Sequence, residues 1–477
     1  MVMHFRKVSK KTISLCMCAL MVMSVAACAG DKESPATTAA TTASEETTAA
    51  TETEPTEPTV YVHGEEGYYS QIENGIATDV QDQGYTPDCW AYATLDVLRL
   101  GNQTVYGKDI EDITVKDIKE LTYGYKEEGL SVGEGERAKD VAGGSTQYVV
   151  WVMANGYNGY TVIENPCLEN VDKSENEDDP FHIKAVTPDQ IKEMLRTKGA
   201  LPVAIRYGSG VMHYNDYTLV NDDTSYERDD GEAILESYLG HEAMIVGYDD
   251  NFPKEYFAQY GHREPSTDGA WLYKESQGET WGDGGYAWLS YDSNFIVDGY
   301  VTLSDAYSKV LSYDNAACAG LSTGDKTTAA NVYHEGGKLA AVGTYVGVSE
   351  TMHDSIYGMQ DEDHSITIEI RDADLNEVLA TKTATFDYDG YYVVELDEPI
   401  EVTDFAVVVT YNGYAPVEGK NEGRIRSGLN YFAKSEAGQS FILNGDEWID
   451  VTDPSIVETL GLREEPNNVC IKALFVD

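Results

Sequence analysis

The stretch "DVQDQGYTPDCWAY" (residues 79–92) contains a cysteine followed directly by a tryptophan, with a glutamine six residues before the cysteine. The segment that begins at this cysteine, "CWAYATLDVLRL" (89–100), predicts a buried helix, because its apolar residues recur on one face. The residues of that face are Trp90, Ala93, Val97 and Leu100. Cys89 is therefore expected at the N-terminal end of the helix, where the helix dipole favours a thiolate.

The turn "DQGYTPD" just before the cysteine is expected to fold Gln83 back beside the sulfur. The side-chain amide of Gln83 and the backbone N–H of Cys89 would then bind an oxyanion that develops on a substrate carbonyl. Taken alone, the spacing Gln-x5-Cys-Trp also fits a buried structural cysteine, so both interpretations stay open at this point.

Length and charge restrict the classes of protein to consider. A chain of 477 residues is too long for one ordinary hydrophobic core, which predicts two or more domains. The 83 acidic residues against 33 basic ones give a formal net charge of −50, which argues against nucleic acid or an anionic membrane surface as a partner. The 34 tyrosines favour a β-rich architecture.

The first 27 residues have the pattern of a bacterial export signal: a basic start and then a largely apolar stretch over 12–23. Val25-Ala26-Ala27 before Cys28 resembles a lipobox, which is cleaved before the cysteine that receives the lipid. We predict a lipoprotein-type signal peptide over 1–27 and lipidation at Cys28, with a plain signal peptide as the alternative. The protein is then expected on the outer face of a bacterial cell membrane, held by its lipid anchor only, or extracellular if the lipobox is not used.

Residues 28–62 are predicted to form a disordered linker. From 31 to 59 they are mostly Thr, Ala, Glu and Pro, with almost no large apolar side chain. Such a composition cannot bury enough surface to offset the conformational entropy of the chain. The linker would hold the folded part away from the cell surface.

Cysteine usage does not indicate a disulfide scaffold. Five cysteines follow the signal peptide, which is few for an exported protein of this size. They are Cys28, Cys89, Cys167, Cys318 and Cys470. One disulfide, Cys318–Cys470, remains an open alternative.

Residues 63–310 are expected to form an α+β domain with two packed lobes, because helix-like segments come first and strand-like segments follow. Within "TPDQIKEMLRTKG" (187–199), Thr187 can cap a helix whose buried face holds Ile191, Met194 and Leu195. The expected strands are 200–207, 243–250, 270–275 and 286–291.

Residues 311–477 lose helical periodicity almost completely. Short runs of β-branched and aromatic residues alternate there with turns rich in Gly, Asp and Asn, which is typical of an all-β sandwich. The clearest of these runs are 365–372, 391–402, 404–413 and 468–477.

Two further segments bear on the function of Cys89. "GHEAMIVGYDD" (240–250) places His241 at the start of an almost wholly apolar strand, and "GAWLYKESQGETWGDGGYAWLSY" (269–291) follows it. A lone histidine in such a place is more often a structural residue. It is unusual, however, that His241 follows Gln83 and Cys89 in the chain and precedes "WGDGGY" (281–286).

These segments together resemble the papain-like (C1 family) cysteine peptidases over about residues 66–305. In that family a Gln…Cys-Trp segment, a His strand ending in Val-Gly-Tyr, and an Asn-Ser-Trp-Gly segment followed by Trp-Gly-x-Gly-Tyr occur in this order. "GGS" (143–145) lies where the family has a glycine pair that binds the substrate. The resemblance implies a two-lobed peptidase domain that acts on protein or peptide substrates. It implies no cofactor and no metal.

Carried over by position, the resemblance implies a role for each matching residue. Cys89 is the nucleophile, His241 exchanges protons with it, and Gln83 helps to stabilise the oxyanion. The backbone of Gly143 and Gly144 binds substrate. Glu275 stands where the family has the asparagine that orients the histidine ring.

Four positions depart from the family pattern. As a carboxylate, Glu275 is expected to accept the histidine N–H and to favour imidazolium. Gln277 replaces a tryptophan, which predicts that water reaches this bond. Pro87 stiffens the wall of the first subsite, and Asp88 either disfavours the thiolate by pointing inward or caps the helix while facing solvent.

The C-terminal region resembles the lectin-like β-sandwich that follows papain-like domains in some bacterial surface proteins. That resemblance implies a carbohydrate or another surface ligand for this domain. Trp448, Tyr411 and Tyr414 are aromatic side chains that could stack on a sugar, although core packing is the commoner use of such residues. The function predicted for the whole chain is an exported, surface-anchored cysteine endopeptidase. The alternative is a catalytically silent papain-like binding protein or adhesin.

Overall fold

The structure is a computed structural model. It describes residues 61–76, 78–110, 112–124, 129–131, 143–169, 186–205, 211–214, 217–220, 241–259, 264–293, 295–297, 299–315, 318–348, 364–419, 422–424 and 430–477. The predicted signal peptide, Cys28 and nearly all of the predicted linker lie outside the described residues. The side chain of Cys318 also lies outside them, so the structure does not test the alternative of a Cys318–Cys470 disulfide.

The predicted helices form, with different ends. The helix of the nucleophile runs to residue 106, beyond the predicted 100, because Gly107 adopts a left-handed φ of 65° and ends it there. Thr187 caps its helix as predicted, in a capping box with Gln190. The helices of the described residues are α1 (Cys89–Tyr106), α2 (Val115–Tyr123), α4 (Thr146–Met153), α5 (Pro188–Thr197), the 3₁₀ helix η1 (Lys254–Tyr256) and α6 (Ile456–Leu460).

The first sheet carries most of the strands predicted before residue 310. Its central strand begins at His241, and all nine of its residues are buried. In spatial order the sheet contains β4 (Leu168–Glu169), β11 (Ile296–Val297), β5 (Leu201–Ile205), β8 (His241–Asp249), β9 (Ala270–Lys274), β10 (Tyr286–Ser290), β7 (Tyr217–Val220) and β6 (Val211–Tyr214), with β1 (Tyr68–Ser70) also paired to β8. Because β8 pairs with β9, the segment after β9 is kept close to the start of β8.

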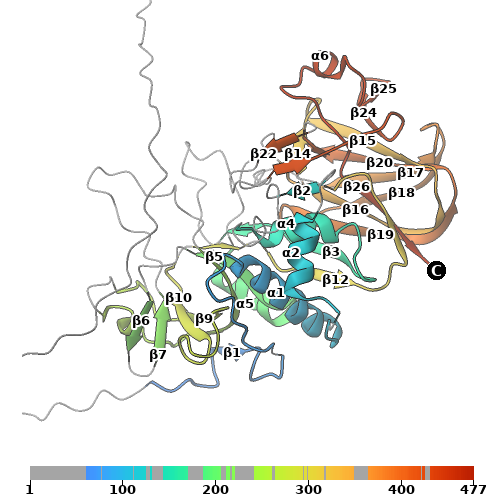
Figure 1. Ribbon diagram of the computed structural model, residues 1–477. Coiled ribbons are helices and arrows are strands. Elements are labelled where there is room, and N and C mark those ends of the chain that lie inside the picture. The colour runs from blue at the N-terminus through green and yellow to red at the C-terminus, as the bar shows by residue number, and fades with distance from the viewer. Residues whose placement is uncertain are drawn as a thin grey trace, which may run out of the picture. The chain divides into compact units, whose positions relative to one another are not determined.

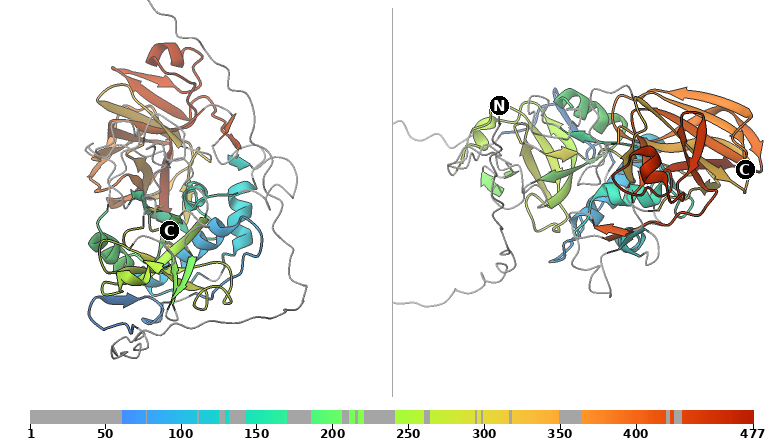
Figure 2. Two further views of the ribbon diagram at one scale, coloured as in Figure 1. Left: turned by 90° about the vertical axis from the view of Figure 1, so that its left-hand side faces the viewer. Right: turned by 90° about the horizontal axis from the view of Figure 1, so that it is seen from above.

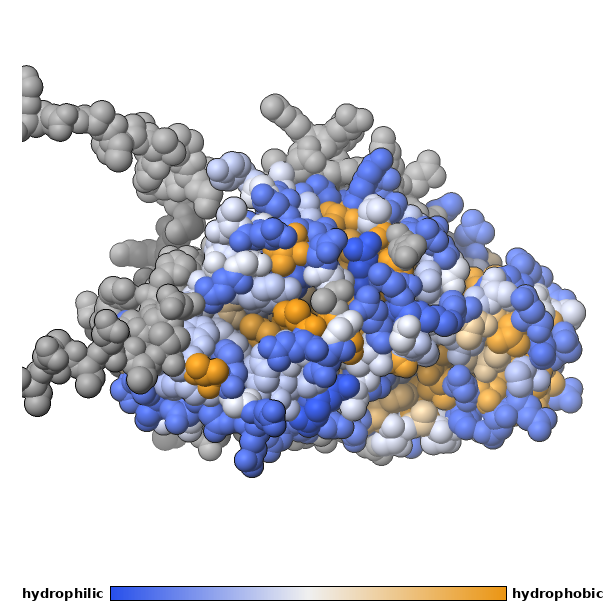
Figure 3. Space-filling view, turned by 90° about the horizontal axis from the view of Figure 1, so that it is seen from below, coloured by the Kyte–Doolittle hydropathy of each residue, from blue (hydrophilic) through white to orange (hydrophobic). Residues whose placement is uncertain are grey.

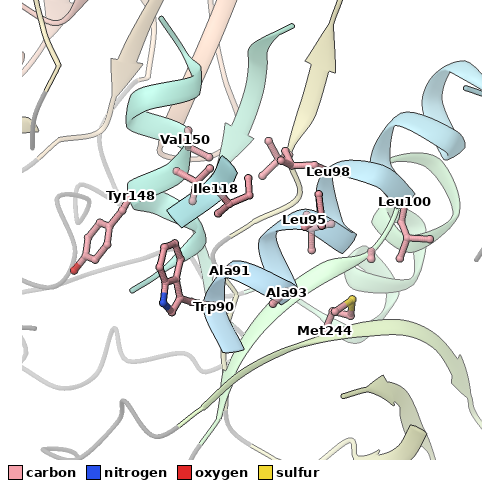
Figure 4. Close-up of a cluster of buried hydrophobic side chains, with 14 of the residues drawn as sticks. Trp90, Ala91, Ala93, Leu95, Leu98, Leu100, Ile118, Tyr148, Val150 and Met244 are labelled. Carbon is pink, nitrogen blue, oxygen red and sulfur yellow. The ribbon is translucent and has the colours of Figure 1, made fainter. Parts of the chain in front are cut away.

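Helix α1 runs through a hydrophobic core that is shared with α2, α4 and β8. Figure 4 shows α1 between Ile118 of α2 and Met244 of β8, with Trp90 near its N-terminal end. Trp90, Ile118 and Met244 are each 1% exposed or less. Burial on opposite sides fixes α1 firmly, so Cys89 at its first turn has a defined position.

The predicted β-sandwich is confirmed, and its two six-stranded sheets face a common apolar core. One sheet contains β18 (Val378–Ala384), β17 (Ile366–Asp372), β20 (Phe405–Asn412), β15 (Lys326–Tyr333), β24 (Ser440–Asn444) and β25 (Glu447–Asp450). The other contains β12 (Thr302–Ser304), β3 (Thr161–Pro166), β19 (Gly390–Val402), β16 (Gly337–Val346), β26 (Ile471–Val476) and β13 (Lys309–Leu311). Apart from β3, which is green, these strands are coloured yellow to red in Figure 1, and Figure 2 shows them from two further sides.

The second sheet crosses the boundary that was predicted near residue 310. Strands β3 and β12 come from the peptidase-like part of the chain, yet β3 pairs with β19 of the sandwich, with Glu164 opposite Tyr392. Short strands make two more pairings, namely β14 (Cys318–Leu321) with β21 (Ala415–Glu418), and β2 (Gly129–Ser131) with β23 (Asn430–Phe432) and β22 (Glu422–Arg424). The two parts therefore share a hydrogen-bonded sheet.

The surface agrees with the acidic composition. Figure 3 shows one face that is largely hydrophilic, with separate small hydrophobic patches. Among the described residues, no helix has the length and apolar content needed to cross a bilayer.

Candidate active site

The structure places Cys89 at the first residue of α1, with Asp88 at the N-cap position. The thiol is partly exposed. The unpaired N–H groups at a helix N-terminus and the helix dipole both favour negative charge at this point. The sequence-based placement of the cysteine therefore agrees with the structure.

A hydrogen bond joins the side chains of Cys89 and His241. Burial raises the pKa of the Cys89 thiol, but the hydrogen bond and charge of His241 and the backbone amides of Glu242 and Trp90 outweigh it. The net effect lowers the pKa of Cys89 below its ordinary value. The site thus favours the thiolate, the form of cysteine that acts as a nucleophile.

On its other side, His241 is bound by Glu275. Nε2 of His241 lies 2.6 Å from both carboxylate oxygens of Glu275 and donates a hydrogen bond to Oε2. Burial lowers the pKa of His241, yet Cys89 and Glu275 together raise it to about 10. The ring is therefore held as imidazolium between a thiolate and a carboxylate.

The expectation that Gln277 admits water to this bond is wrong. Glu275 is 1% exposed and His241 is 7% exposed. Gln277 pairs with Asp82 in an isolated β-bridge, which joins the segment before Gln83 to the segment after Glu275. Because both partners are buried, the bond lies in a medium of low dielectric constant.

Gln83 is anchored to the residue next to Glu275. Its backbone N–H donates to the carbonyl of Ser276 at 2.8 Å, and the Ser276 hydroxyl donates to Oε1 of Gln83 at 2.6 Å. One hydrogen of the Gln83 amide goes to the carbonyl of Thr86 at 2.7 Å, and the amide nitrogen carries a second one. The structure thus orients the amide of Gln83, and its role as an oxyanion donor stays a prediction.

Gly143 and Gly144 lie beside the tryptophan that follows the nucleophile. A Cβ atom at Gly144 would come within 2.5 Å of the Trp90 ring and 2.6 Å of the Tyr123 hydroxyl, whereas one at Gly143 would meet no atom within 4 Å. Tyr123 donates a hydrogen bond to the carbonyl of Gly143. Position 144 therefore requires glycine, and substrate binding by the pair stays a prediction.

Neither role expected for Asp88 is found. Its side chain makes no capping hydrogen bond, and at 6% exposure it does not face solvent. Instead, Oδ2 of Asp88 lies 2.8 Å from Nζ of Lys119 on α2. The ammonium pairs with the carboxylate, and Asp88 is not one of the main groups that shift the pKa of Cys89. Pro87 is exposed beside it.

Sequence reasoning missed a buried ion pair that joins the elements of the site. Nζ of Lys274 on β9 lies 2.6 Å from Oδ2 of Asp96 on α1, and also donates to the carbonyls of Thr78 and Asp79. Lys274 directly precedes Glu275, and Asp96 lies two turns after Cys89. The available signal was one charged residue inside each of two apolar runs, "ATLDVL" and "AWLYK".

The sequence also did not predict a second buried network, which consists of side-chain hydrogen bonds. Oε1 of Glu242, the residue after His241, accepts a hydrogen bond from the Thr146 hydroxyl at 2.6 Å, and that hydroxyl lies 2.9 Å from the hydroxyl of Thr94. These residues belong to β8, α4 and α1, so the network links the strand of the histidine to the helix of the nucleophile. A glutamate inside "HEAMIV" was the only sequence signal.

In the described part of the chain, no group of three or more His, Cys, Asp and Glu side chains is arranged to hold a metal ion. The chemistry that this arrangement can support is nucleophilic attack by a thiolate, with an imidazolium as proton donor.

Comparison with known families agrees with this geometry. The papain family cysteine protease profile matches residues 69–304, and the lectin-like domain profile matches residues 310–475. The Arabidopsis thaliana protein described as "Probable cysteine protease RDL5" is 25% identical over 224 residues, which is 44% of this chain. The alignment covers 49% of that protein, so the chain spans about half the length of this curated relative.

Two solved structures share the fold across both parts. The clostridial cysteine protease Cwp84 after propeptide cleavage has a TM-score of 0.57 at 18% identity, covering 85% of this chain and 98% of that one. The cysteine protease and lectin-like domains of Cwp84, described as a surface layer associated protein of Clostridium difficile, have a TM-score of 0.56 at 20% identity, covering 85% and 88%. The chain therefore contains a domain of the papain family of cysteine proteases, followed by a C-terminal lectin-like domain.

Proposed function

We propose that this protein is an exported, surface-anchored cysteine endopeptidase in which Glu275 replaces the usual asparagine. The observation that carries the proposal is the hydrogen-bonded series Cys89–His241–Glu275, in which the thiol pKa is lowered and the imidazole pKa is raised. A cysteine with a purely structural role would not require a lowered thiol pKa or a neighbouring histidine with a raised pKa. Perturbed pKa values of this kind are typical of functional sites.

The reaction follows from the charges. The thiolate of Cys89 attacks the scissile carbonyl carbon, and the N–H of Cys89 and the amide of Gln83 stabilise the oxyanion. The imidazolium of His241 gives its proton to the leaving amine as the C–N bond breaks, which leaves a thioester on Cys89. The neutral ring then takes a proton from a water molecule that attacks the thioester, which releases the acid and restores the ion pair.

Glu275 would act through His241 and make no contact with substrate. Its carboxylate holds Nε2, so that Nδ1 of the same ring faces the sulfur, and its charge stabilises imidazolium. Gly143 and Gly144 are proposed to bind the backbone of the peptide substrate beside Trp90. A Cβ atom at Gly143 would meet no atom within 4 Å, so this glycine borders open space into which a substrate could enter.

Export and anchoring are part of the proposal. The lipobox-like Val25-Ala26-Ala27-Cys28 and the polar linker to residue 62 support attachment by lipid at Cys28. The shared fold with Cwp84, which is described as surface layer associated, supports a place at the cell surface. The lectin-like domain is proposed to bind a carbohydrate or another surface ligand, which would hold the peptidase near its substrates.

Covalent labelling by an epoxide inhibitor of papain-like enzymes tests the proposal. In reducing buffer at neutral pH, we expect one equivalent of label on Cys89 and cleavage of a denatured protein substrate. Cys89→Ala should abolish both while Cys167→Ala, at a buried cysteine away from the site, should leave both intact. If the native protein is neither labelled nor active, and Cys89→Ala behaves identically, the chain is a catalytically silent binding protein.

A further inference from the structure

An open cavity of about 430 Å³ lies where the sandwich meets the peptidase-like part, away from the residues of the candidate active site. Residues of both parts line it, and the paired strands β3 and β19 form one side, with Glu164 opposite Tyr392 in the shared sheet. Its volume is within the range of small-molecule sites, which are about 300–1,000 Å³. A hydrogen-bonded sheet beneath it means that the cavity is largely preformed.

Aromatic rings dominate the lining. They belong to Tyr300, Tyr307, Phe386, Tyr388 and Tyr392. Phe386 stacks on Tyr392 with ring centroids 4.1 Å apart and an interplanar angle of 21°. The Tyr392 hydroxyl donates to the carbonyl of Tyr388 at 3.0 Å, and the Tyr388 hydroxyl accepts from Gln190 at 2.9 Å. These contacts fix the rings before any ligand arrives.

The charged groups of the lining are all negative. Glu164, Asp387 and Glu395 contribute three carboxylates, and none of the described lining residues is basic. One of these carboxylates also affects a tyrosine of the lining. Burial and, after it, the charge of Glu395 raise the pKa of Tyr307 to about 12. Aromatic faces and carboxylates attract the same kind of ligand, a cation.

The protein already places one ammonium in such surroundings at the edge of the cavity. Nζ of Lys198 lies 4.9 Å from the centre of the Tyr300 ring and 2.5 Å from Oε2 of Glu164. The other oxygen of Glu164 accepts from the Tyr300 hydroxyl at 2.5 Å. A ring and a carboxylate thus hold a positive group together here, and the remaining rings and Glu395 offer the same combination to a ligand.

We propose that the cavity beside the paired strands β3 and β19 binds an alkylammonium group, through the rings of Tyr307, Phe386 and Tyr388 and the carboxylate of Glu395. The two sources of such a group are a small quaternary amine and the lysine side chain of a protein. The site is separate from the proposed peptidase activity and does not depend on the reactivity of Cys89.

Titration with matched probes tests the proposal in the purified protein and in its Cys89→Ala variant, followed by calorimetry or by tyrosine fluorescence. Choline is compared with its neutral isostere 3,3-dimethyl-1-butanol, and Nα-acetyl-lysinamide with Nα-acetyl-norleucinamide. We expect the charged member of at least one pair to bind about tenfold or more tightly than the neutral member, and its affinity to fall with salt. Tighter binding of choline indicates a small amine, and tighter binding of the lysine probe indicates a protein.

A second glutamate on the strand of Glu395 supplies the control. Glu395→Gln and Phe386→Ala should each weaken binding about fivefold or more, whereas Glu398→Gln, which is exposed on β19 and outside the lining, should not. Equal binding of charged and neutral probes, or tighter binding of glucose than of choline, overturns the proposal. So does the absence of binding, or binding that Glu395→Gln and Phe386→Ala leave unchanged in variants with native circular dichroism.

Discussion

Nε2 of His241 lies 2.6 Å from the carboxylate of Glu275, in a pair that is almost completely shielded from solvent. An amide at position 275 could accept the same hydrogen bond without bringing a charge. What the carboxylate adds is its negative charge, which stabilises the imidazolium and so offsets the lowering of the His241 pKa by burial. This relationship decides the pH range in which the proposed peptidase works.

The first prediction concerns that pH range. The pKa of Cys89 is lowered and that of His241 is raised to about 10, so the ion pair exists between the two values. We expect kcat/KM to rise on an acid limb below the ordinary thiol pKa and to fall on an alkaline limb near pH 10. Glu275→Asn should retain or raise activity at neutral pH and move the alkaline limb to lower pH. The measurement is kcat/KM for a peptide substrate from pH 4 to 11.

The matched control for this change is Glu275→Ala, which removes the acceptor as well as the charge. The loss of a hydrogen bond to a charged group should lower kcat/KM about 10- to 100-fold at neutral pH. An alkaline limb that stays in place in Glu275→Asn would contradict the assignment of the His241 pKa to this carboxylate. Complete inactivity of the same variant would reveal a role that charge and hydrogen bonding do not explain.

The second prediction separates the oxyanion donor from the nucleophile. Gln83→Ala should lower kcat for peptide hydrolysis by about 10²- to 10³-fold, because one donor to the tetrahedral oxyanion is lost. Alkylation of Cys89 by iodoacetamide forms no oxyanion, so its rate should change little. Gln81→Ala is the control, since Gln81 uses its backbone carbonyl to bind Gly278. An equal fall of both rates in Gln83→Ala would place Gln83 in the support of the thiolate.

The third prediction concerns the buried pair of Lys274 and Asp96. Lys274→Met leaves a buried carboxylate without its cation, which should cost about 3–5 kcal/mol of unfolding free energy. In Asp96→Leu/Lys274→Met both charges are replaced by apolar groups, and most of that loss should be recovered. Urea unfolding of the two variants and the parent measures the effect. Equal destabilisation of the single and double variants would mean that contacts other than the ion pair hold these elements together.

The fourth prediction compares the two glycines. Gly144→Ala forces a methyl group against the Trp90 ring, which should destabilise the fold by about 1–3 kcal/mol and raise KM, because Trp90 adjoins Cys89. Gly143→Ala meets no atom within 4 Å and should change stability by less than about 0.5 kcal/mol. Thermal unfolding and steady-state kinetics of both variants check this. Similar effects at the two positions would contradict the close approach of Gly144 to Trp90.

Local signals in the sequence accounted for the elements and for the candidate residues. The apolar face that begins at Trp90, the capping residue Thr187 and the alternating strands after residue 311 predicted structure correctly, because each depends on neighbours within a few positions. The order of Gln83, Cys89 and His241 predicted the fold family, which the family comparison confirms.

Aromatic residues were harder to interpret. Tyr411, a candidate for stacking on sugars, is 2% exposed and lies within hydrogen-bond distance of the Thr344 hydroxyl in the core. Trp448 and Tyr414 pack against hydrophobic clusters. The aromatic cavity is formed by other residues, since a strand pattern does not show which rings meet across two parts of the chain.

The sequence by itself indicated Cys89 and His241 as the candidate catalytic residues and predicted the two kinds of domain, since motif spacing and periodicity are properties of short segments. Tertiary structure alone decided that Asp88 pairs with Lys119, that Lys274 reaches Asp96, and that β3 joins the sheet of the sandwich. In each of these cases the partners are separated by between 31 and more than 200 positions. Which buried charge finds which partner depends on how the whole core closes, and the energy of such a pair exists only after water has been excluded from it.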